Sequence, residues 1–319
     1  MGRITVRRRV TRRTVGASVT RREDVLAVEE PLEIRVGGKS LAITMRTPGH
    51  DVDLAAGFLV SEGVIRSGVD FAAARYCAGA NPEGLNTYNV LDITLAPGVA
   101  PPDPSLERNF YTTSSCGLCG KASIEAVRTL SAYPVAGDSL RVTDARLVSF
   151  PDRLRAGQDV FEKTGGLHAA ALFDGATGEM LVLREDVGRH NAVDKVIGWA
   201  TTEGLLPLRG MVLMVSGRAS FELTQKASMA GIPFLAAVSA PSSLAVELAA
   251  EVGLTVVGFL RGDSMVVYAG DERIVSAAAE TDAAETDAEP DTAETDAAVP
   301  SLPVGMPTLV RLSQEAGVR

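Results

Sequence analysis

The chain has 319 residues, of which 46% are hydrophobic, and its 31 basic and 40 acidic residues give a formal net charge of −9 at pH 7. This length accommodates two modest domains or one large one, with enough apolar residues for a sizeable core. No stretch reaches the roughly 18 apolar residues that a membrane-spanning helix requires, so we expect no membrane partner.

The two ends of the chain carry opposite charges. Residues 1–22 contain eight arginines and no acid, whereas residues 277–298 contain eight acids and no base. Neither stretch has apolar periodicity, so we predict a disordered basic arm over residues 1–22 and a disordered acidic tail over residues 273–319. The arm lacks the interleaved aromatic residues of a nucleic-acid-binding segment and the apolar stretch of an export signal. We therefore expect a cytoplasmic protein with no nucleic-acid partner.

Residues 23–110 predict a β-rich N-terminal region that contains one helix. Side chains alternate between apolar and polar over residues 25–47 and pause at Gly37-Gly38, which is a hairpin signal. Further elements expected here are a helix that begins near Asp51 and a pair of strands over residues 69–78 and 86–96.

After Gly165-Gly166 the pattern changes to strands and helices in alternation. Short apolar strands bounded by turn residues are typical of a largely parallel sheet that helices cover on both faces. We therefore predict an α/β domain over residues 166–272, joined to the β-rich region by a cysteine loop and connecting helices over residues 111–165. The expected strands cover residues 168–184 (a hairpin), 211–215, 234–239, 254–260 and 265–269, and the expected helices cover residues 121–130, 143–163, 189–202, 219–230 and 242–252.

Cys116 and Cys119 form a C-x-x-C pair beside Gly117 and Gly120, in a chain with one other cysteine, Cys77. The two glycines lack the Cβ atom that would crowd a neighbouring thiol. The thiolate is the reactive form of cysteine, and a helix N-terminus lowers the thiol pKa below its ordinary value of about 8.5. Because a helix is expected to begin near Cys119, the pair indicates sulfur chemistry.

Three other interpretations of the cysteine pair stay open. A zinc site needs about four ligands, and Cys77, His50, His168 and His190 provide no second pair at a suitable spacing. A thioredoxin-like dithiol follows a strand in an early βαβ unit, whereas this pair follows a proline-rich loop. A structural disulfide belongs to an oxidising compartment, and so few cysteines without an export signal suit a reducing one. We expect no metal site.

Three loops that follow predicted parallel strands are rich in small and hydroxyl-bearing residues, over residues 216–220, 239–243 and 259–264. Ligands of open α/β sheets bind beyond the carboxyl ends of the strands, where helix N-termini direct N–H groups outward. Each loop could equally be an ordinary cap or turn, but two of them contain an arginine, which can bind a phosphate through two N–H groups. Together they indicate a phosphorylated or nucleotide ligand. The candidate binding residues are Ser216, Arg218, Phe259, Leu260, Arg261, Gly262, Asp263, Ser264, and His190 from a polar cluster that opens a helix.

Six segments of the sequence, in order, resemble the FdhD family, the formate dehydrogenase accessory sulfurtransferases. They are CGLCG, TGGLHAAAL, EDVGRHNAVDKVIGW, SGRASFELTQKA, AVSAPSSLAVELA and GFLRGDS, and the resemblance covers roughly residues 25–270. It implies a deaminase-like three-layer α/β domain with an added β-rich region, usually as a homodimer. The basic arm and the acidic tail lie outside the resemblance.

The resemblance also implies a function. In that family a cysteine desulfurase passes sulfur to the accessory protein as a cysteine persulfide. The sulfur then goes to the molybdenum (or tungsten) cofactor, a bis-molybdopterin guanine dinucleotide complex, before its insertion into the catalytic subunit of formate dehydrogenase. The persulfide carrier falls on Cys116 and the cofactor loop on residues 259–264, and we expect Cys119 to assist. The metal complex is then a substrate, and no tightly bound cofactor is expected.

Two alternatives remain beside this sulfurtransferase hypothesis. A non-catalytic chaperone would bind the molybdenum cofactor and hand it over, and both cysteines would then be replaceable. A thiol–disulfide oxidoreductase would need both cysteines equally.

Overall fold

The computed structural model describes residues 4–77, 88–103 and 131–276. Backbone contacts divide the chain after Glu280, so all of the described residues belong to one unit. Cys116, Cys119 and the helix predicted over residues 121–130 lie outside the described residues.

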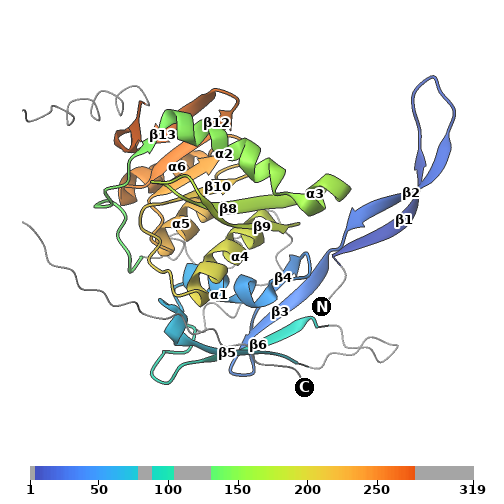
Figure 1. The fold of residues 1–319 in the computed structure, drawn as a ribbon. Coiled ribbons are helices and arrows are strands. Elements are labelled where there is room, and N and C mark those ends of the chain that lie inside the picture. Colours follow the sequence, from blue (N-terminus) through green and yellow to red (C-terminus); the bar gives the residue numbers. More distant parts are fainter. Residues whose placement is uncertain (1–3, 78–87, 104–130, 277–319) are drawn as a thin grey trace, which may run out of the picture. The chain divides into compact units, whose positions relative to one another are not determined.

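A six-stranded sheet forms the centre of the α/β part (Figure 1). Its strands are β8 (His168–Asp174), β9 (Met180–Asp186), β10 (Met211–Val215), β11 (Phe234–Ala237), β12 (Thr255–Arg261) and β13 (Ser264–Ala269), in the spatial order β13-β12-β11-β10-β8-β9. Only β10, β11 and β12 are parallel to one another, and the other three pairings are antiparallel. The expectation of a largely parallel sheet is therefore wrong outside the central strands. Short turns join β8 to β9 and β12 to β13, and only antiparallel neighbours can be joined in this way.

Helices cover both faces of this sheet (Figure 1). Helix α2 (Asp144–Ala156), which precedes the short α3 (Asp159–Thr164), lies on one face, and α4 (Arg189–Thr202), α5 (Phe221–Met229) and α6 (Ser243–Val252) lie on the other. Along β10, Met214 packs with the α2 side and Val215 with the α4 side, so the strand is buried on both faces and reads as a continuous apolar run. The three layers confirm the expected α/β fold, and its likeness to deaminases stays a prediction.

The α/β part includes residues on both sides of its predicted limits of 166 and 272. Before residue 166, α2 packs on the sheet, and β7 (Val142–Thr143) pairs in parallel with β14 (Ile274–Val275). Beyond residue 272, the buried Arg273 donates hydrogen bonds to the carbonyl oxygens of Gly253 and Val135. Packing against the sheet, rather than a change in composition, decides which residues lie with this part.

The N-terminal region contains a second, four-stranded sheet. Its strands are β3 (Glu30–Val36), β4 (Lys39–Arg46), β5 (Phe71–Tyr76, after the 3-10 turn η1, Gly68–Asp70) and β6 (Val90–Leu95), in the order β4-β3-β6-β5. Helix α1 (Asp51–Ser61) follows β4 and packs against α4. The hairpin at Gly37-Gly38, the helix near Asp51 and the second strand pair are all confirmed.

The expectation of a disordered basic arm is wrong for the described part of residues 1–22. Strand β1 (Thr5–Arg12) pairs antiparallel with β2 (Thr20–Ala27), and the two form a sheet of their own. Its arginines are exposed, and β1 also contains β-branched residues such as Val6 and Val10, which favour strands. A two-stranded hairpin is held by its backbone hydrogen bonds, so the absence of a clear apolar face did not prevent it.

Two glycines allow α1 and α4 to touch backbone to backbone. A Cβ atom added to Gly57 would lie 1.9 Å from the backbone oxygen of Asp194, and one added to Gly198 would lie 1.7 Å from the backbone oxygen of Asp53. Any larger residue would force the helices apart, because packed interiors have no spare volume. This contact joins the N-terminal region to the α/β part. None of the helices in the described ranges is long and apolar enough to cross a lipid bilayer.

Gly57→Ala is expected to lower the free energy of unfolding by about 3 kcal/mol or more, because overpacked interiors must shift their backbone. Urea titration monitored by circular dichroism measures the change. Gly137→Ala is the matched control, since Gly137 is exposed and an added Cβ there meets nothing within 4 Å. Equal stability of the two variants would show that the helices do not depend on this contact.

Candidate functional site

The candidate site lies at the edge of the larger sheet where the parallel strands end. Strands β10, β11 and β12 end at Val215, Ala237 and Arg261. Because β8 is antiparallel to β10 and β9 is antiparallel to β8, the start of β8 at His168 and the end of β9 at Asp186 lie at the same edge. Helix α4 begins there at Arg189. The ends of these strands and the N-terminus of α4 thus lie at one edge of the sheet.

The loops at this edge lie side by side. The Ser239 N–H donates a hydrogen bond to the Gly217 carbonyl (3.4 Å), and the Phe259 N–H donates one to the Ser239 carbonyl (3.3 Å). On the other side, Nδ1 of His168 is 3.5 Å from where a Cβ on Gly217 would lie. The three loops that the sequence singled out are therefore neighbours, as expected of the carboxyl ends of adjacent strands.

Arg189 contributes a positive charge at this edge. Its Nε is buried and has no hydrogen-bond partner among the described residues. Burial and then the charges of Arg189 and His190 lower the pKa of His168, which places these three side chains in one electrostatic environment. A buried polar group without a partner is costly. An anionic ligand would supply the missing partner.

His190 lies next to Ser220 and Glu222 of the loop and helix that follow β10. Its Nε2 is 3.3 Å from Oγ of Ser220 and 3.4 Å from Oε2 of Glu222. Burial opposes ionisation of Glu222, but the contacts with His190 outweigh it and hold the pKa of Glu222 at about 2. His190 therefore lies at this edge in contact with a hydroxyl and a carboxylate of the α5 segment.

The predicted residues Ser216 and Arg218 have different surroundings. The hydroxyl of Ser216 accepts the Ala169 N–H (2.9 Å) and so joins β10 to β8. Arg218 is exposed. In the loop over residues 239–243, Ser242 caps α6 by accepting the Ala245 N–H (3.3 Å), which makes it an ordinary helix cap.

The segment over residues 259–264 combines one strained residue with a hairpin turn. Phe259 has φ 51° and its side chain is exposed. A left-handed conformation costs such a residue about 1–2 kcal/mol and is common at functional sites. Leu260 is 0% exposed, so its expected contact with a ligand would have to come from its backbone. The irregular pairing between Gly258 and Arg261 turns Phe259 outward and Leu260 into the core. The remaining predicted residues, Arg261, Gly262, Asp263 and Ser264, are exposed.

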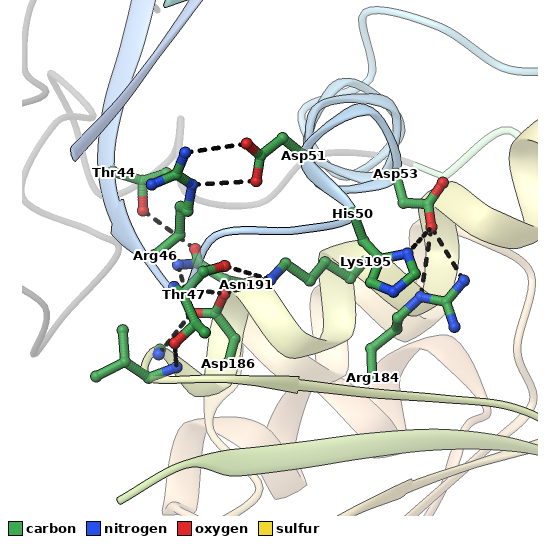
Figure 2. Close-up of polar contacts among 12 residues, drawn as sticks. Thr44, Arg46, Thr47, His50, Asp51, Asp53, Arg184, Asp186, Asn191 and Lys195 are labelled. Carbon is green, nitrogen blue, oxygen red and sulfur yellow. Dashed lines mark hydrogen bonds and ion pairs between the residues drawn. The ribbon is translucent and has the colours of Figure 1, made fainter. Parts of the chain in front are cut away.

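A network of buried charges lies behind this edge (Figure 2). Lys195 and Asp186 form an ion pair at 2.7 Å, and the Asp186 carboxylate also accepts the Thr47 N–H (3.1 Å). Across the loop between β4 and α1, Arg46 donates two hydrogen bonds to Asp51, each 3.0 Å long. Burial raises the pKa of Asp186, while the Lys195 ammonium acts in the opposite direction.

A third ionic cluster joins α1 to β9 nearby. Asp53 lies within reach of both Arg184 (3.1 Å) and Nδ1 of His50 (3.4 Å), as Figure 2 shows. Burial opposes the ionisation of Asp53, but hydrogen bonds from His50 and Arg184 lower its pKa overall. These contacts fix α1 to the edge strand of the larger sheet.

Sequence reasoning missed several residues that the structure brings to this edge. Arg189, Ser220 and Glu222 were not singled out, and His168 was weighed and left aside. A signal existed for Arg189, which sits beside His190 in the polar cluster that opens α4. No sequence signal marks that its Nε lacks a hydrogen-bond partner among the described residues, because that property depends on the whole fold.

Both cysteines of the C-x-x-C pair lie outside the described residues, whereas Cys77 is a partly buried free thiol. Over residues 4–77, 88–103 and 131–276, no group of three His, Cys, Asp or Glu side chains has the geometry to hold a metal ion.

The sequence model of the FdhD/NarQ family matches residues 27–275. The chain belongs to the FdhD/NarQ family. This confirms the resemblance found in the sequence. A relative from Streptomyces coelicolor, named sulfur carrier protein FdhD, is 65% identical over 280 residues, which is 88% of this chain and 99% of the relative. A relative of the same name from Mycobacterium tuberculosis is 58% identical over 277 residues, covering 86% of this chain and 100% of the relative.

A solved structure supports the fold of this family member. The crystal structure of a candidate formate dehydrogenase accessory protein from Desulfotalea psychrophila has a TM-score of 0.64 and 23% sequence identity, covering 86% of this chain and 100% of the other. At this identity the likeness establishes the fold.

Glu222→Gln is expected to weaken the dependence of stability on acid pH. The pKa of Glu222 is held at about 2 against an ordinary 4.5, so its contribution is present above pH 4.5 and is lost as the pH falls from 4.5 to 2. After solvent screening we expect the parent to lose about 1–2 kcal/mol more than the variant over this range. Urea titrations at several pH values measure the difference.

Glu247→Gln, on the exposed side of α6, is the control and should follow the parent. If Glu222→Gln also follows the parent, the contact with His190 does not stabilise the folded chain.

Proposed function

We propose that this chain is a sulfurtransferase of formate dehydrogenase maturation. It accepts sulfur from a cysteine desulfurase as a persulfide on Cys116 and transfers it to the molybdenum cofactor, bis-molybdopterin guanine dinucleotide. The loaded cofactor then enters the formate dehydrogenase catalytic subunit. Membership of the FdhD/NarQ family and the name of the relatives, sulfur carrier protein FdhD, support a role in carrying sulfur.

The observation that carries the proposal is the buried Nε of Arg189, which has no hydrogen-bond partner among the described residues. The guanidinium lies at the N-terminus of a 14-residue helix, where backbone N–H groups already favour an anion. It stands beside His168 and His190, and its Nε is buried without a partner in the described structure. A dinucleotide cofactor carries several phosphates, so its chemistry matches what this edge lacks.

The neighbouring loops offer further contacts to such a substrate. Arg218 and Arg261 are exposed at the ends of β10 and β12 and are suited to phosphate oxygens. The exposed ring of Phe259 offers an apolar surface to a guanine or pterin ring. Asp263, on the turn after β12, is suited to accept hydrogen bonds from a guanine edge.

Loading is a thiol exchange. The Cys116 thiolate attacks the outer sulfur of the desulfurase persulfide, a new S–S bond forms, and the desulfurase cysteine leaves as a thiolate. Cys116 then carries the transferred sulfur. Gly117 and Gly120, each of which follows one of the cysteines, lack the Cβ atom that would crowd a neighbouring thiol.

Delivery uses the second cysteine. The Cys119 thiolate attacks Sγ of the protonated Cys116 persulfide, which forms a disulfide between the two cysteines and expels hydrosulfide. Hydrosulfide becomes a ligand of the metal. A cellular dithiol then reduces the disulfide and restores both thiols, which places the protein in a reducing cytoplasm. We further propose that it acts as a homodimer.

The direct test is intact mass spectrometry after incubation of the full chain with a cysteine desulfurase and cysteine. We expect a gain of about 32 Da, one sulfur atom bound as a persulfide. Cys116→Ala should abolish the gain, whereas the control Cys77→Ala should retain it. Cys119→Ala should gain sulfur but fail to release it.

A persulfide that persists in Cys116→Ala would contradict the assignment. If Cys116→Ala also supports formate dehydrogenase maturation in cells that lack the parent protein, the chain is instead a non-catalytic cofactor chaperone.

A further inference from the structure

Asp186 and Lys195 form an ion pair in the interior of the chain. Their side chains are 0% and 2% exposed, and Nζ lies 2.7 Å from Oδ2. The same Nζ donates a hydrogen bond to the Thr47 carbonyl (2.9 Å). Neither side chain is open to a ligand, so the proposed function leaves both without a role.

The Asp186 carboxylate connects two segments that are far apart in the sequence. Its Oδ1 accepts the Gly188 N–H (2.8 Å) and an N–H of the Asn191 side chain (3.0 Å). Its Oδ2 accepts the Thr47 N–H (3.1 Å). One carboxylate therefore holds both the turn before α4 and the loop after β4, as Figure 2 shows.

Arg189 and His190 lie inside this tethered turn. Gly188 and Asn191, which flank them on either side, both donate to the same oxygen of Asp186. A further hydrogen bond, from the Val187 N–H to Oγ1 of Thr47 (3.2 Å), ties the turn to the loop. Arg189 and His190, which lie at the ligand edge, are therefore held in place by hydrogen bonds to buried groups that do not themselves lie at that edge.

Stability alone gives no reason for this arrangement. A buried ion pair is often no more stabilising than an apolar pair of the same volume, because both charges lose their water. An ionised carboxylate can accept several N–H groups at once, whereas an apolar side chain accepts none. Lys195 compensates the charge that makes this possible.

We infer that Asp186 and Lys195 are positioning residues that hold Arg189 and His190 in the geometry that binds the anionic substrate. This inference rests on the proposed function and deepens it, because it names what orders the binding groups. The interior pair fixes the turn, and the turn positions the side chains of Arg189 and His190.

The test compares two double variants that each remove a buried ion pair. Asp186→Val with Lys195→Met removes the pair behind the turn. Asp194→Val with Lys226→Met removes a second pair, 2.7 Å apart and also inside the chain, whose carboxylate binds Lys226 and the Ser61 hydroxyl. Val and Met keep approximately the shapes of Asp and of the aliphatic part of Lys.

The probe is GDP, the nucleotide end of the proposed substrate, titrated by calorimetry into the full chain. We expect at least tenfold weaker binding for the first double variant and less than a twofold change for the second. Hydrogen exchange of the peptide over residues 187–191 should accelerate at least tenfold in the first variant only. Equal GDP affinity in the parent and the first variant, or an equal loss in both variants, would overturn the inference.

Thr47→Val provides a milder test that does not disturb the ions. It removes the hydroxyl that accepts the Val187 N–H, and it should weaken GDP binding about threefold and accelerate exchange over the same peptide. If the first double variant does not fold, this variant decides, and unchanged binding with unchanged exchange would overturn the inference. If the parent itself does not bind GDP, the proposed substrate is wrong, and the exchange measurement still decides whether the pair orders the turn.

Discussion

The carboxylate of Asp186 is the constraint on which the arrangement of the site depends. It is fully buried, it is paired with Lys195, and it accepts N–H groups from both the turn before α4 and the loop after β4. The N-terminal region and the α/β part therefore share one interior polar centre. The glycine contact between α1 and α4 brings the two parts close enough to share this carboxylate. The geometry of the site therefore depends on how these two helices pack.

The distribution of buried charge distinguishes structural groups from the candidate binding group. Arg46 and Asp51, Lys195 and Asp186, and Lys226 and Asp194 are each paired inside the chain. Removing one member of such a pair typically destabilises a protein by about 3–5 kcal/mol. Arg189 lies in the same neighbourhood, and its buried Nε has no hydrogen-bond partner among the described residues. The contrast indicates that its partner comes from outside the chain.

The sequence predicted the elements well because they follow from local rules. Apolar alternation, turn glycines and helix-starting residues located most strands and helices of the described parts, but not β1 and β2, which form where disorder was expected. Pairing was harder, because the antiparallel outer strands depend on which turns are short enough to fold back directly. The buried position of Leu260 follows from a local irregularity in β12 that alternation does not reveal. Whether Nε of Arg189 finds a hydrogen-bond partner depends on side chains from several elements, so no local sequence pattern could show that it lacks one among the described residues.

The most direct measurement of the central claim is a calorimetric titration of GDP into Arg189→Ala and into Arg75→Ala. Arg75 is the matched control, because its side chain is 79% exposed on β5, away from the ends of the parallel strands. If the edge binds the anionic part of a guanylated substrate, Arg189→Ala should bind GDP at least tenfold more weakly than the parent, and Arg75→Ala should bind it equally well. Parent-like affinity in Arg189→Ala would contradict the account.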